Sequence, residues 1–225
     1  MSHLFVIRHG QANFNGDNYD QLSEKGWEQS RLLGERMANQ ELLWDHVVCG
    51  PKRRHRETME AVSRAYEAAG RPFPEPVFVP GFDEHRGASV VVQYLEQRGQ
   101  MPDKDTPDGF RQYFSMFEDI SRRWVQGEIH APDLESWSQF RDRVIGGLED
   151  IINNRAGKVA VFTSGGPVGL ISAHSLGASD VKAMELSWKI RNTGYAEFLF
   201  KADRFSMVRC NATPHISDSH LETMI

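Results

Sequence analysis

Three consecutive residues, Arg8, His9 and Gly10, combine a permanent positive charge, an imidazole and a flexible glycine directly after the apolar run 4–7. An imidazole can attack phosphorus, and a guanidinium binds phosphate through two parallel hydrogen bonds. The spacing therefore predicts a phosphoryl-transfer site with His9 as the nucleophile and Arg8 as a phosphate ligand. On its own, a tripeptide of this kind more often simply ends a strand in solvent.

Three further polar residues, Asn15, Arg54 and Glu84, fall at or just past the ends of predicted strands. Arg54 would share the phosphoryl oxygens with Arg8, Asn15 would donate an amide hydrogen bond, and Glu84 would protonate the departing alcohol. Such a set demands no metal ion and no cofactor. Each residue also has a plainer interpretation: Arg54 lies in a basic run that solvent could cover, Glu84 could be a surface carboxylate, and Asn15 a turn residue.

The elements that would position these groups alternate between strands and helices. The short apolar run 4–7 ends at a glycine, which is typical of a strand buried on both faces, and ligands bind at the carboxyl ends of such strands. Strands are predicted at 4–7, 47–49, 77–79, 158–163, 196–200 and 205–210, the last two forming a hairpin. Helices are predicted at 24–39, 54–69, 90–98, 110–125, 135–153 and from about 168, with Pro167 at the first helical position. The order predicts a three-layer α/β/α fold around a mainly parallel sheet, with the proline-flanked strand 77–79 at its edge.

Residues 88–132 break the alternation, because two helical patterns follow each other without a strand between them. We expect one domain over residues 1–225, with this segment as a helical insertion that covers the site and selects the substrate. The insertion carries five basic residues, most of which we expect to be solvated: Arg98, Lys104, Arg111, Arg122 and Arg123.

Composition narrows the classes of partner. The 26 basic and 31 acidic residues give a net charge of -5, which provides no general attraction to nucleic acid or to an anionic membrane. The two cysteines, Cys49 and Cys210, have no spacing suited to zinc and indicate a reduced, cytoplasmic compartment. No run approaches the roughly 18 apolar residues of a membrane span, and the start of the chain does not resemble an export signal.

The motifs, taken in order, resemble those of the histidine phosphatase superfamily, which includes the cofactor-dependent phosphoglycerate mutases, over nearly the whole chain. Arg8-His9-Gly10-Gln11 is similar to the family's Arg-His-Gly-Glu opening, with Asn15 where the family often has a phosphate-binding asparagine. The other similar segments are residues 22–29, 50–58, 82–87 and the pair 135–136. The resemblance implies that His9 becomes a phosphohistidine, that Arg8 and Arg54 bind the phosphoryl group, and that Glu84 is the proton donor. The resemblance identifies the second phosphate-binding arginine as Arg54 rather than Arg53 or Arg56.

One position departs from the family pattern. The family has a second histidine in a Ser-His-Gly sequence after the late strand, where this chain reads Ser164-Gly165-Gly166. Loss of such a donor costs on the order of 100-fold to 1000-fold in rate. The backbone N–H groups of Gly165 and Gly166, at a helix start, could bind the anion instead. A replacement histidine, His85 or His55, is the less favoured compensation.

The sequence favours a metal-independent phosphomonoesterase acting on a small phosphorylated metabolite or a phosphopeptide. A mutase is less favoured, because its phosphohistidine must survive while the substrate reorients. The alternative is a phosphate-binding or regulatory protein of the same fold with impaired turnover.

Two other classes of hydrolase fit less well. A cysteine phosphatase at Cys49 has the wrong spacing, since His55 stands where the arginine would be, and a serine hydrolase at Ser164 lacks the glycine of its motif because Phe162 occupies that place. We also expect neighbouring guanidiniums to lower the pKa of His9, which would keep the nucleophile available below neutral pH.

Overall fold

The structure is a computed structural model that describes residues 1–13, 20–103 and 105–224. Within these residues, six strands form one sheet in the order β3-β2-β4-β1-β5-β6. Their bounds are β1 Ser2–Arg8, β2 His46–Cys49, β3 Pro76–Phe78, β4 Lys158–Thr163, β5 Tyr195–Lys201 and β6 Arg204–Ala212. Strands β3, β2, β4 and β1 run parallel, while β5 and β6 are antiparallel. The mainly parallel sheet, with the proline-flanked strand β3 at its edge, is confirmed.

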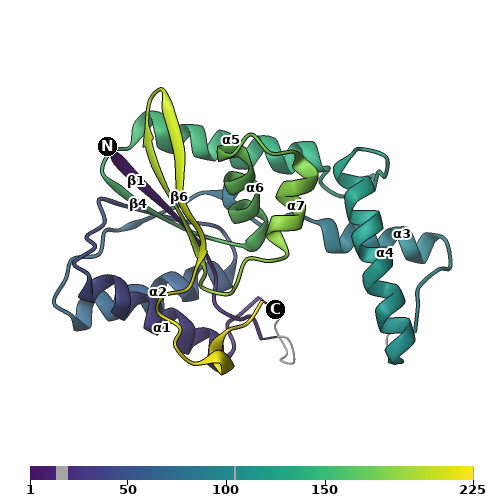
Figure 1. Ribbon diagram of the computed structural model, residues 1–225, viewed down its shortest axis with the longest axis horizontal. Helices are drawn as coiled ribbons and strands as arrows, with labels where there is room; N and C mark the ends of the chain where they lie inside the picture. The colour runs from purple at the N-terminus through teal and green to yellow at the C-terminus, as the bar shows by residue number, and fades with distance from the viewer. Residues whose placement is uncertain (14–19, 104, 225) are drawn as a thin grey trace.

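Helices cover both faces of the sheet, as Figure 1 shows. Helices α1 (Glu24–Asn39) and α2 (Arg53–Ala68) lie on one face, and α5 (Trp137–Asn154), α6 (Gly165–Ser175) and α7 (Asp180–Ser187) on the other. The alternation of side chains along each strand creates two cores. In β1, Leu4 and Val6 join the core beneath α5 and α6, whereas Phe5 and Ile7 join the core beneath α1 and α2. The three-layer α/β/α architecture predicted from the sequence is thereby confirmed.

Two helices differ from the sequence prediction on the α6–α7 side. Helix α6 begins at Gly165 with Ser164 as its N-cap residue, not near residue 168, so Pro167 is its third residue rather than its first. The prediction was wrong because glycine is a poor helix former and two glycines gave no helical pattern. Helix α7 was not predicted; it is short, and its start is stabilised by the Ser179 hydroxyl, which accepts a hydrogen bond from the Lys182 N–H.

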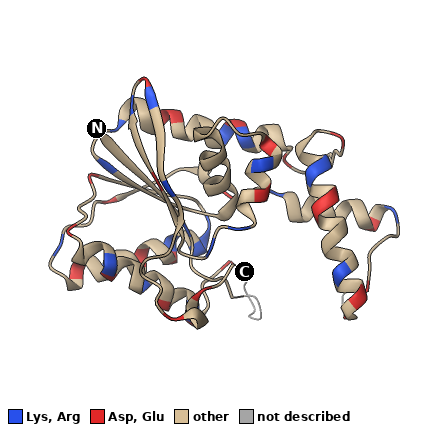
Figure 2. Cartoon of the chain, viewed as in Figure 1, with Lys and Arg blue, Asp and Glu red and all other residues tan. Residues whose placement is uncertain are grey.

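Helices α3 (Gly87–Gln97) and α4 (Pro107–Val125) form an arm beside the α/β body (Figure 1). Charges of both signs alternate on α4 (Figure 2), and Arg122 and Arg123 lie 3.7 and 3.8 Å from the carboxylates of Glu118 and Asp119 one turn earlier. Such pairs support an exposed helix face. The remaining short elements are the 3-10 helices η1 (Pro80–Phe82) and η2 (Ser219–Leu221).

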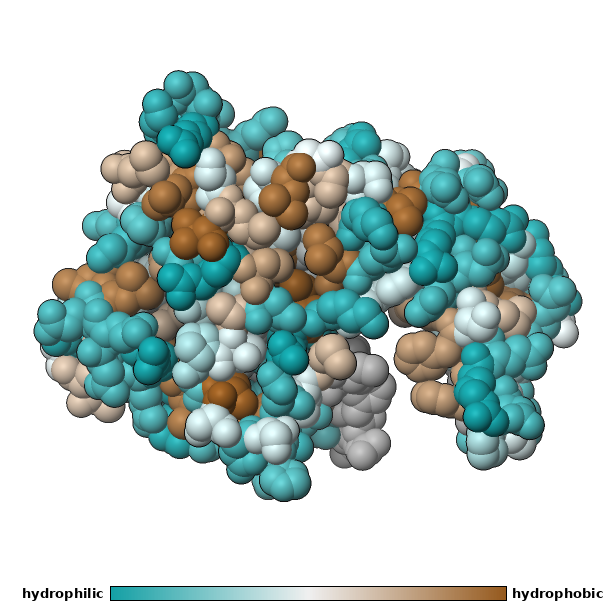
Figure 3. Space-filling view, in the orientation of Figure 1, coloured by the Kyte–Doolittle hydropathy of each residue, from teal (hydrophilic) through white to brown (hydrophobic). Residues whose placement is uncertain are grey.

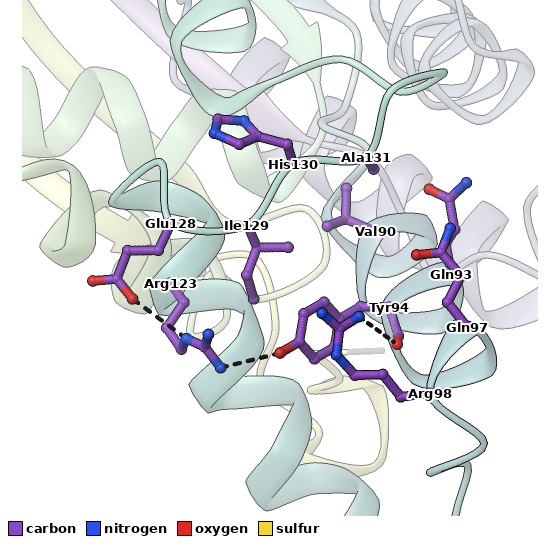
Figure 4. Close-up of a pocket in the computed structure, with 10 residues that line it drawn as sticks. All are labelled: Val90, Gln93, Tyr94, Gln97, Arg98, Arg123, Glu128, Ile129, His130 and Ala131. Atoms are coloured by element: carbon purple, nitrogen blue, oxygen red, sulfur yellow. Dashed lines mark hydrogen bonds and ion pairs between the residues drawn. The ribbon is translucent and has the colours of Figure 1, made fainter.

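A small cavity of about 140 Å³ lies between the two arm helices, and Figure 4 shows its side chains. The guanidinium of Arg98 lies over the ring of Tyr94, 3.7 Å from its centroid. Arg123 of α4 donates a hydrogen bond to the Tyr94 hydroxyl over 3.3 Å and is paired with Glu128 at 3.3 Å. Tyr94 therefore ties α3 to α4. In the described part of the chain, no helix has both the length and the apolar character that a membrane span needs.

Candidate active site

The register of the sheet brings three strand ends to one edge. Arg8 at the end of β1 lies opposite Thr163 at the end of β4, and Cys49 at the end of β2 lies opposite Phe162. The residues that follow these strands therefore converge, although those after β4 are more than 100 positions from the others in the sequence. Gly10 permits this convergence, because a Cβ atom there would lie 2.4 Å from the carbonyl oxygen of Gly26 in the first turn of α1.

The imidazole of His9 is buried and held at both ring nitrogens. Its Nδ1 lies 2.7 Å from the carbonyl oxygen of Gly10, and its Nε2 accepts a hydrogen bond from Nε of Arg54 over 3.0 Å. A carbonyl oxygen can only accept and a guanidinium can only donate, so the proton belongs on Nδ1 and the lone pair on Nε2. The fold thus fixes the tautomer in which Nε2 is the nucleophilic atom.

Burial is the main reason that the pKa of His9 lies well below its ordinary value of 6.5, and the positive charges of Arg54 and Arg8 lower it further. The hydrogen bond to Gly10 raises this pKa but does not reverse the shift. The direction agrees with the expectation from the sequence, which considered only the charges. His9 is therefore neutral at pH 7, as a nucleophile must be.

Arg54 lies in the first turn of α2 and is held from several sides. Its Nη1 is 2.8 Å from the carboxylate of Asp20, and its Nη2 donates to the hydroxyl of Ser164 over 3.5 Å. The same hydroxyl lies 2.6 Å from Nε2 of the buried His55. Burial, followed by the charges of Arg54 and Lys52, holds the pKa of His55 well below 6.5, so its neutral ring can accept the Ser164 proton. These contacts orient the guanidinium of Arg54 so that its Nε faces His9.

Arg8 is held by two backbone carbonyl oxygens from the C-terminal part of the chain. Its Nη1 donates to the carbonyl oxygens of Ile190 and of Met224, the latter over 2.7 Å. A Cβ atom added at Gly165 would lie 3.6 Å from Nε of Arg8 and 3.0 Å from the carbonyl oxygen of Ser187. A side chain at position 165 would therefore begin between the Ser187 carbonyl oxygen and Arg8.

Glu84 lies in the loop after η1 and is bound by backbone donors. Its carboxylate accepts hydrogen bonds from the N–H of His85 over 2.9 Å and from the N–H of Gly166 over 3.2 Å. The Gly166 N–H, expected from the sequence to bind the substrate anion, thus binds the Glu84 carboxylate in this structure. A Cβ atom at Gly166 would lie 2.0 Å from Glu84 Oε1, so only glycine permits this approach.

Opposing effects set the pKa of Glu84. Burial raises it, while the charge of His85, the two backbone hydrogen bonds and the charge of Arg54 lower it by more, so that it lies below its ordinary value of 4.5. The carboxyl group is therefore ionised at neutral pH. A phosphate dianion bound nearby would raise this pKa again, because like charges oppose ionisation.

A cavity of about 510 Å³ opens at this edge of the sheet. Five of the predicted site residues line it: Arg8, His9, Glu84, Gly165 and Gly166. Arg54 reaches the site through its hydrogen bond to His9, and Asn15 lies outside the described residues. Among the residues that the structure describes, no three His, Cys, Asp or Glu side chains gather as a metal site would require.

The structure also bears on the less favoured alternatives. Cys49 is buried, and burial raises the pKa of its thiol to about 12, which opposes a thiolate nucleophile. Ser164 is fully buried and bonded to His55. Of the two candidate replacement histidines, His85 lines the cavity and packs edge-on against Phe140, with ring centroids 5.3 Å apart, whereas His55 is fully buried behind Ser164.

Sequence reasoning missed the apolar part of the cavity. Phe114 and Phe117 of the arm and Trp188 after α7 line it. The described basic residues of the insertion do not line it; Arg111, for example, pairs with Asp108 at the exposed start of α4. A signal was present, because three phenylalanines, at positions 110, 114 and 117, are spaced to share one helix face.

Comparisons with known proteins agree with the fold. A model of the histidine phosphatase superfamily (branch 1) matches residues 4–213. No curated protein matches the chain in sequence. A solved structure of Bacillus stearothermophilus YhfR is similar with a TM-score of 0.69 at 17% identity, covering 96% of this chain and 99% of that chain. A putative alpha-ribazole-5'-P phosphatase from Escherichia coli has a TM-score of 0.65 at 16% identity, covering 94% and 97%. Phosphoserine phosphatase from Entamoeba histolytica, in complex with 3-phosphoglyceric acid, has a TM-score of 0.62 at 17% identity, covering 96% and 99%.

Proposed function

Because the chain belongs to the histidine phosphatase superfamily, we propose that it hydrolyses phosphate monoesters through a phosphohistidine formed at Nε2 of His9. The observation that carries this proposal is the pair of hydrogen bonds on the His9 ring. Nδ1 faces the Gly10 carbonyl at 2.7 Å and Nε2 faces Arg54 at 3.0 Å, in a cavity large enough for a small phosphate ester.

In the first step, the Nε2 lone pair of His9 attacks phosphorus. The nitrogen–phosphorus bond forms as the ester oxygen–phosphorus bond breaks, and the departing alkoxide takes a proton from the carboxylic acid of Glu84. Arg8 and Arg54 bind the phosphoryl oxygens and neutralise their charge, which is the main requirement in phosphoryl transfer. The scheme needs no metal ion.

In the second step, water attacks the phosphohistidine. The Glu84 carboxylate takes a proton from that water, the nitrogen–phosphorus bond breaks, and inorganic phosphate and the starting form of His9 result. Glu84 enters this step as a carboxylate because it gave its proton to the alcohol in the first step, and the hydrogen bonds and positive charges that lower its pKa favour this form. For the first step, Glu84 must carry a proton when the substrate is bound. Either the negative charge of the substrate dianion raises the pKa of Glu84, or a phosphate monoanion delivers its own proton.

Gly165 favours a second candidate, a phosphate-binding protein of the same fold with impaired turnover. No imidazole is present at this position, so the developing charge on the phosphoryl oxygens lacks the donor that the family resemblance implies there. Arg8, Arg54 and His9 would still bind phosphate without that donor.

Incubation with 4-nitrophenyl phosphate distinguishes the two candidates. The proposal expects a rate that the substitution His9→Ala abolishes and His220→Ala, at an exposed site, leaves unchanged. It also expects a mass increase of one phosphoryl group on the wild-type chain in an acid-free quench. Binding of inorganic phosphate in calorimetry without any turnover would support the phosphate-binding protein instead. Turnover that survives His9→Ala would refute a phosphohistidine at this residue.

A further inference from the structure

An apolar wall extends from the predicted phosphate site toward the arm. Among the residues that the structure describes, six form the apolar part of the cavity lining: Ala12, Ala88, Phe114, Phe117, Trp188 and Met224. The polar groups Arg8, His9 and Glu84 line the same cavity. In Figure 3, a hollow separates the body from the arm, and apolar side chains gather on the arm's side of it.

The aromatic residues of this wall form a continuous series from the body to the arm. The ring of Trp188 lies 6.0 Å from that of Phe117, and the ring of Phe117 lies 6.5 Å from that of Phe114. Phe114 remains 45% exposed at the mouth of the cavity. An exposed phenylalanine on a helix whose other faces carry ion pairs is unfavourable in water unless a partner covers it, and contiguous exposed apolar surface marks a binding site.

Polar contacts of helix α4 with its neighbours hold the apolar wall in position. The hydrogen bond from Arg123 to Tyr94 and the stacking of Arg98 on the same ring tie α4 to α3 (Figure 4). At the other end of the wall, Arg122 of α4 is paired with Glu185 of α7 at 3.3 Å. A preformed apolar wall favours binding, because little side-chain freedom is lost when a ligand contacts it.

Charged groups in the lining argue against a second anionic group on the substrate. In the described part of the lining, Lys189 at the rim is the single cation apart from Arg8, and Glu118 places a carboxylate beside the aromatic wall. A second phosphate or carboxylate would need paired cationic donors in place of this arrangement.

We propose that the alcohol part of the substrate is an aromatic or bulky apolar group, which packs on Phe114, Phe117 and Trp188 while the phosphate lies between Arg8 and Arg54. This inference rests on the proposed function for its phosphate site. It assigns Phe114 and Phe117 as specificity-determining residues. The substrate class is a phosphate monoester of an apolar alcohol, rather than a sugar phosphate or a substrate with a second acidic group.

The test compares two phosphates whose leaving alcohols have similar acidity, benzyl phosphate and ethyl phosphate, together with the matching phosphonates, which bind without reacting. Burial of the phenyl ring is expected to raise kcat/KM, and to lower the Kd of the phosphonate, by about 10-fold to 100-fold. Phe114→Ala is expected to reduce this preference at least fivefold. Phe78→Ala is the matched control, since Phe78 is 47% exposed but lies on β3, outside the cavity lining.

The phosphonates separate failure of this inference from failure of the proposed function. If neither ester is hydrolysed but benzylphosphonate still binds more tightly through Phe114, the wall has the assigned role and the hydrolytic function is wrong. If both esters are hydrolysed equally in a His9-dependent way, or the two phosphonates bind equally, the apolar substrate class is overturned. The same holds if Phe78→Ala reduces the preference as much as Phe114→Ala does.

Discussion

Nε of Arg54 donates a hydrogen bond to Nε2 of His9 over 3.0 Å, which joins the start of α2 to the end of β1 across 45 residues of sequence. The contact places a permanent positive charge beside the atom that we propose attacks phosphorus. It lowers the pKa of His9, keeps the lone pair on Nε2 and leaves Arg54 next to the place where a phosphoryl group would bind.

The first prediction concerns the pH dependence of turnover. Because burial and the charges of Arg54 and Arg8 hold the pKa of His9 well below 6.5, Nε2 lacks a proton at pH 6 as it does at pH 7. We expect kcat for an aryl phosphate to fall less than about twofold between pH 7 and pH 6, because the ring remains neutral over this range. Steady-state rates with circular dichroism at each pH measure this. A sigmoidal loss with a midpoint near 6.5 would contradict the assignment.

The second prediction separates adjacent arginines. Arg54→Ala removes the group bound to His9, and we expect kcat/KM to fall by about 100-fold or more. Arg54→Lys should recover little, because an ammonium lacks the planar fork. Arg53 is the control: its side chain is 53% exposed and pairs with Glu57, so Arg53→Ala should change the rate less than about twofold. Equal losses of kcat/KM in both variants would show that Arg54 has no specific role at the site.

The third prediction tests Glu84 as the proton donor. For Glu84→Gln we expect kcat/KM with ethyl phosphate to fall by about 100-fold to 10,000-fold, because the alkoxide then leaves without a proton. With 4-nitrophenyl phosphate the loss should be at least tenfold smaller, since that leaving group is stable as an anion. Glu118→Gln, which changes another carboxylate in the described part of the lining, serves as the control. Similar losses on both substrates would assign Glu84 a role other than proton donation.

The fourth prediction compares neighbouring glycines. A Cβ atom at Gly166 would lie 2.0 Å from Glu84 Oε1 and 2.7 Å from the His85 ring, so Gly166→Ala must displace the carboxylate. At Gly165 the nearest atom is the carbonyl oxygen of Ser187 at 3.0 Å, which requires a smaller adjustment. We expect kcat/KM to fall by about tenfold or more for Gly166→Ala and by about threefold or less for Gly165→Ala, with both variants folded. The reverse order would show that the Gly166–Glu84 contact does not position the acid.

The fifth prediction concerns stability, because three histidines are buried in their neutral form. Burial lowers the pKa of His215 to about 4, and the pKa values of His9 and His55 also lie well below 6.5. Below pH 6.5 the unfolded chain binds protons that the folded chain does not, so the free energy of unfolding must decrease as the pH falls. Each histidine contributes a slope of up to about 1.4 kcal/mol per pH unit.

Urea denaturation at several pH values between 7 and 5.5, above the range in which carboxylates titrate, measures this slope. We expect His215→Gln to make the slope smaller, because one of the three protons is then no longer linked to unfolding. The exposed His220 provides the control, since His220→Gln should leave the slope unchanged. A free energy of unfolding that does not depend on pH in this range would show that the three histidines are not buried in the neutral form.

Much of the fold followed from local patterns. The sequence predicted helix α1 with its Ser23 cap, which accepts the Gly26 N–H over 3.1 Å, and strand β4 with the bounds that the structure shows. Both have strong local signals: a capping residue before an amphipathic run, and an uninterrupted apolar run. The early start of α6 was missed because its two glycines give no helical signal. Helix α7 was missed because its eight residues are too few to show a helical period clearly.

The grouping of His9, Arg8 and Arg54 at one edge of the sheet could be inferred from the sequence, since residue type and position after a strand or at a helix start are local properties. The hydrogen-bond partner of each donor could not be inferred from the sequence, because it depends on which segments the sheet register brings together. Only the tertiary structure assigns the Gly166 N–H to Glu84, and only it places Phe114 beside the cavity that His9 lines. The sequence by itself therefore indicated the protein family, while packing between distant segments decided how the Glu84 carboxylate is held and which apolar side chains line the cavity.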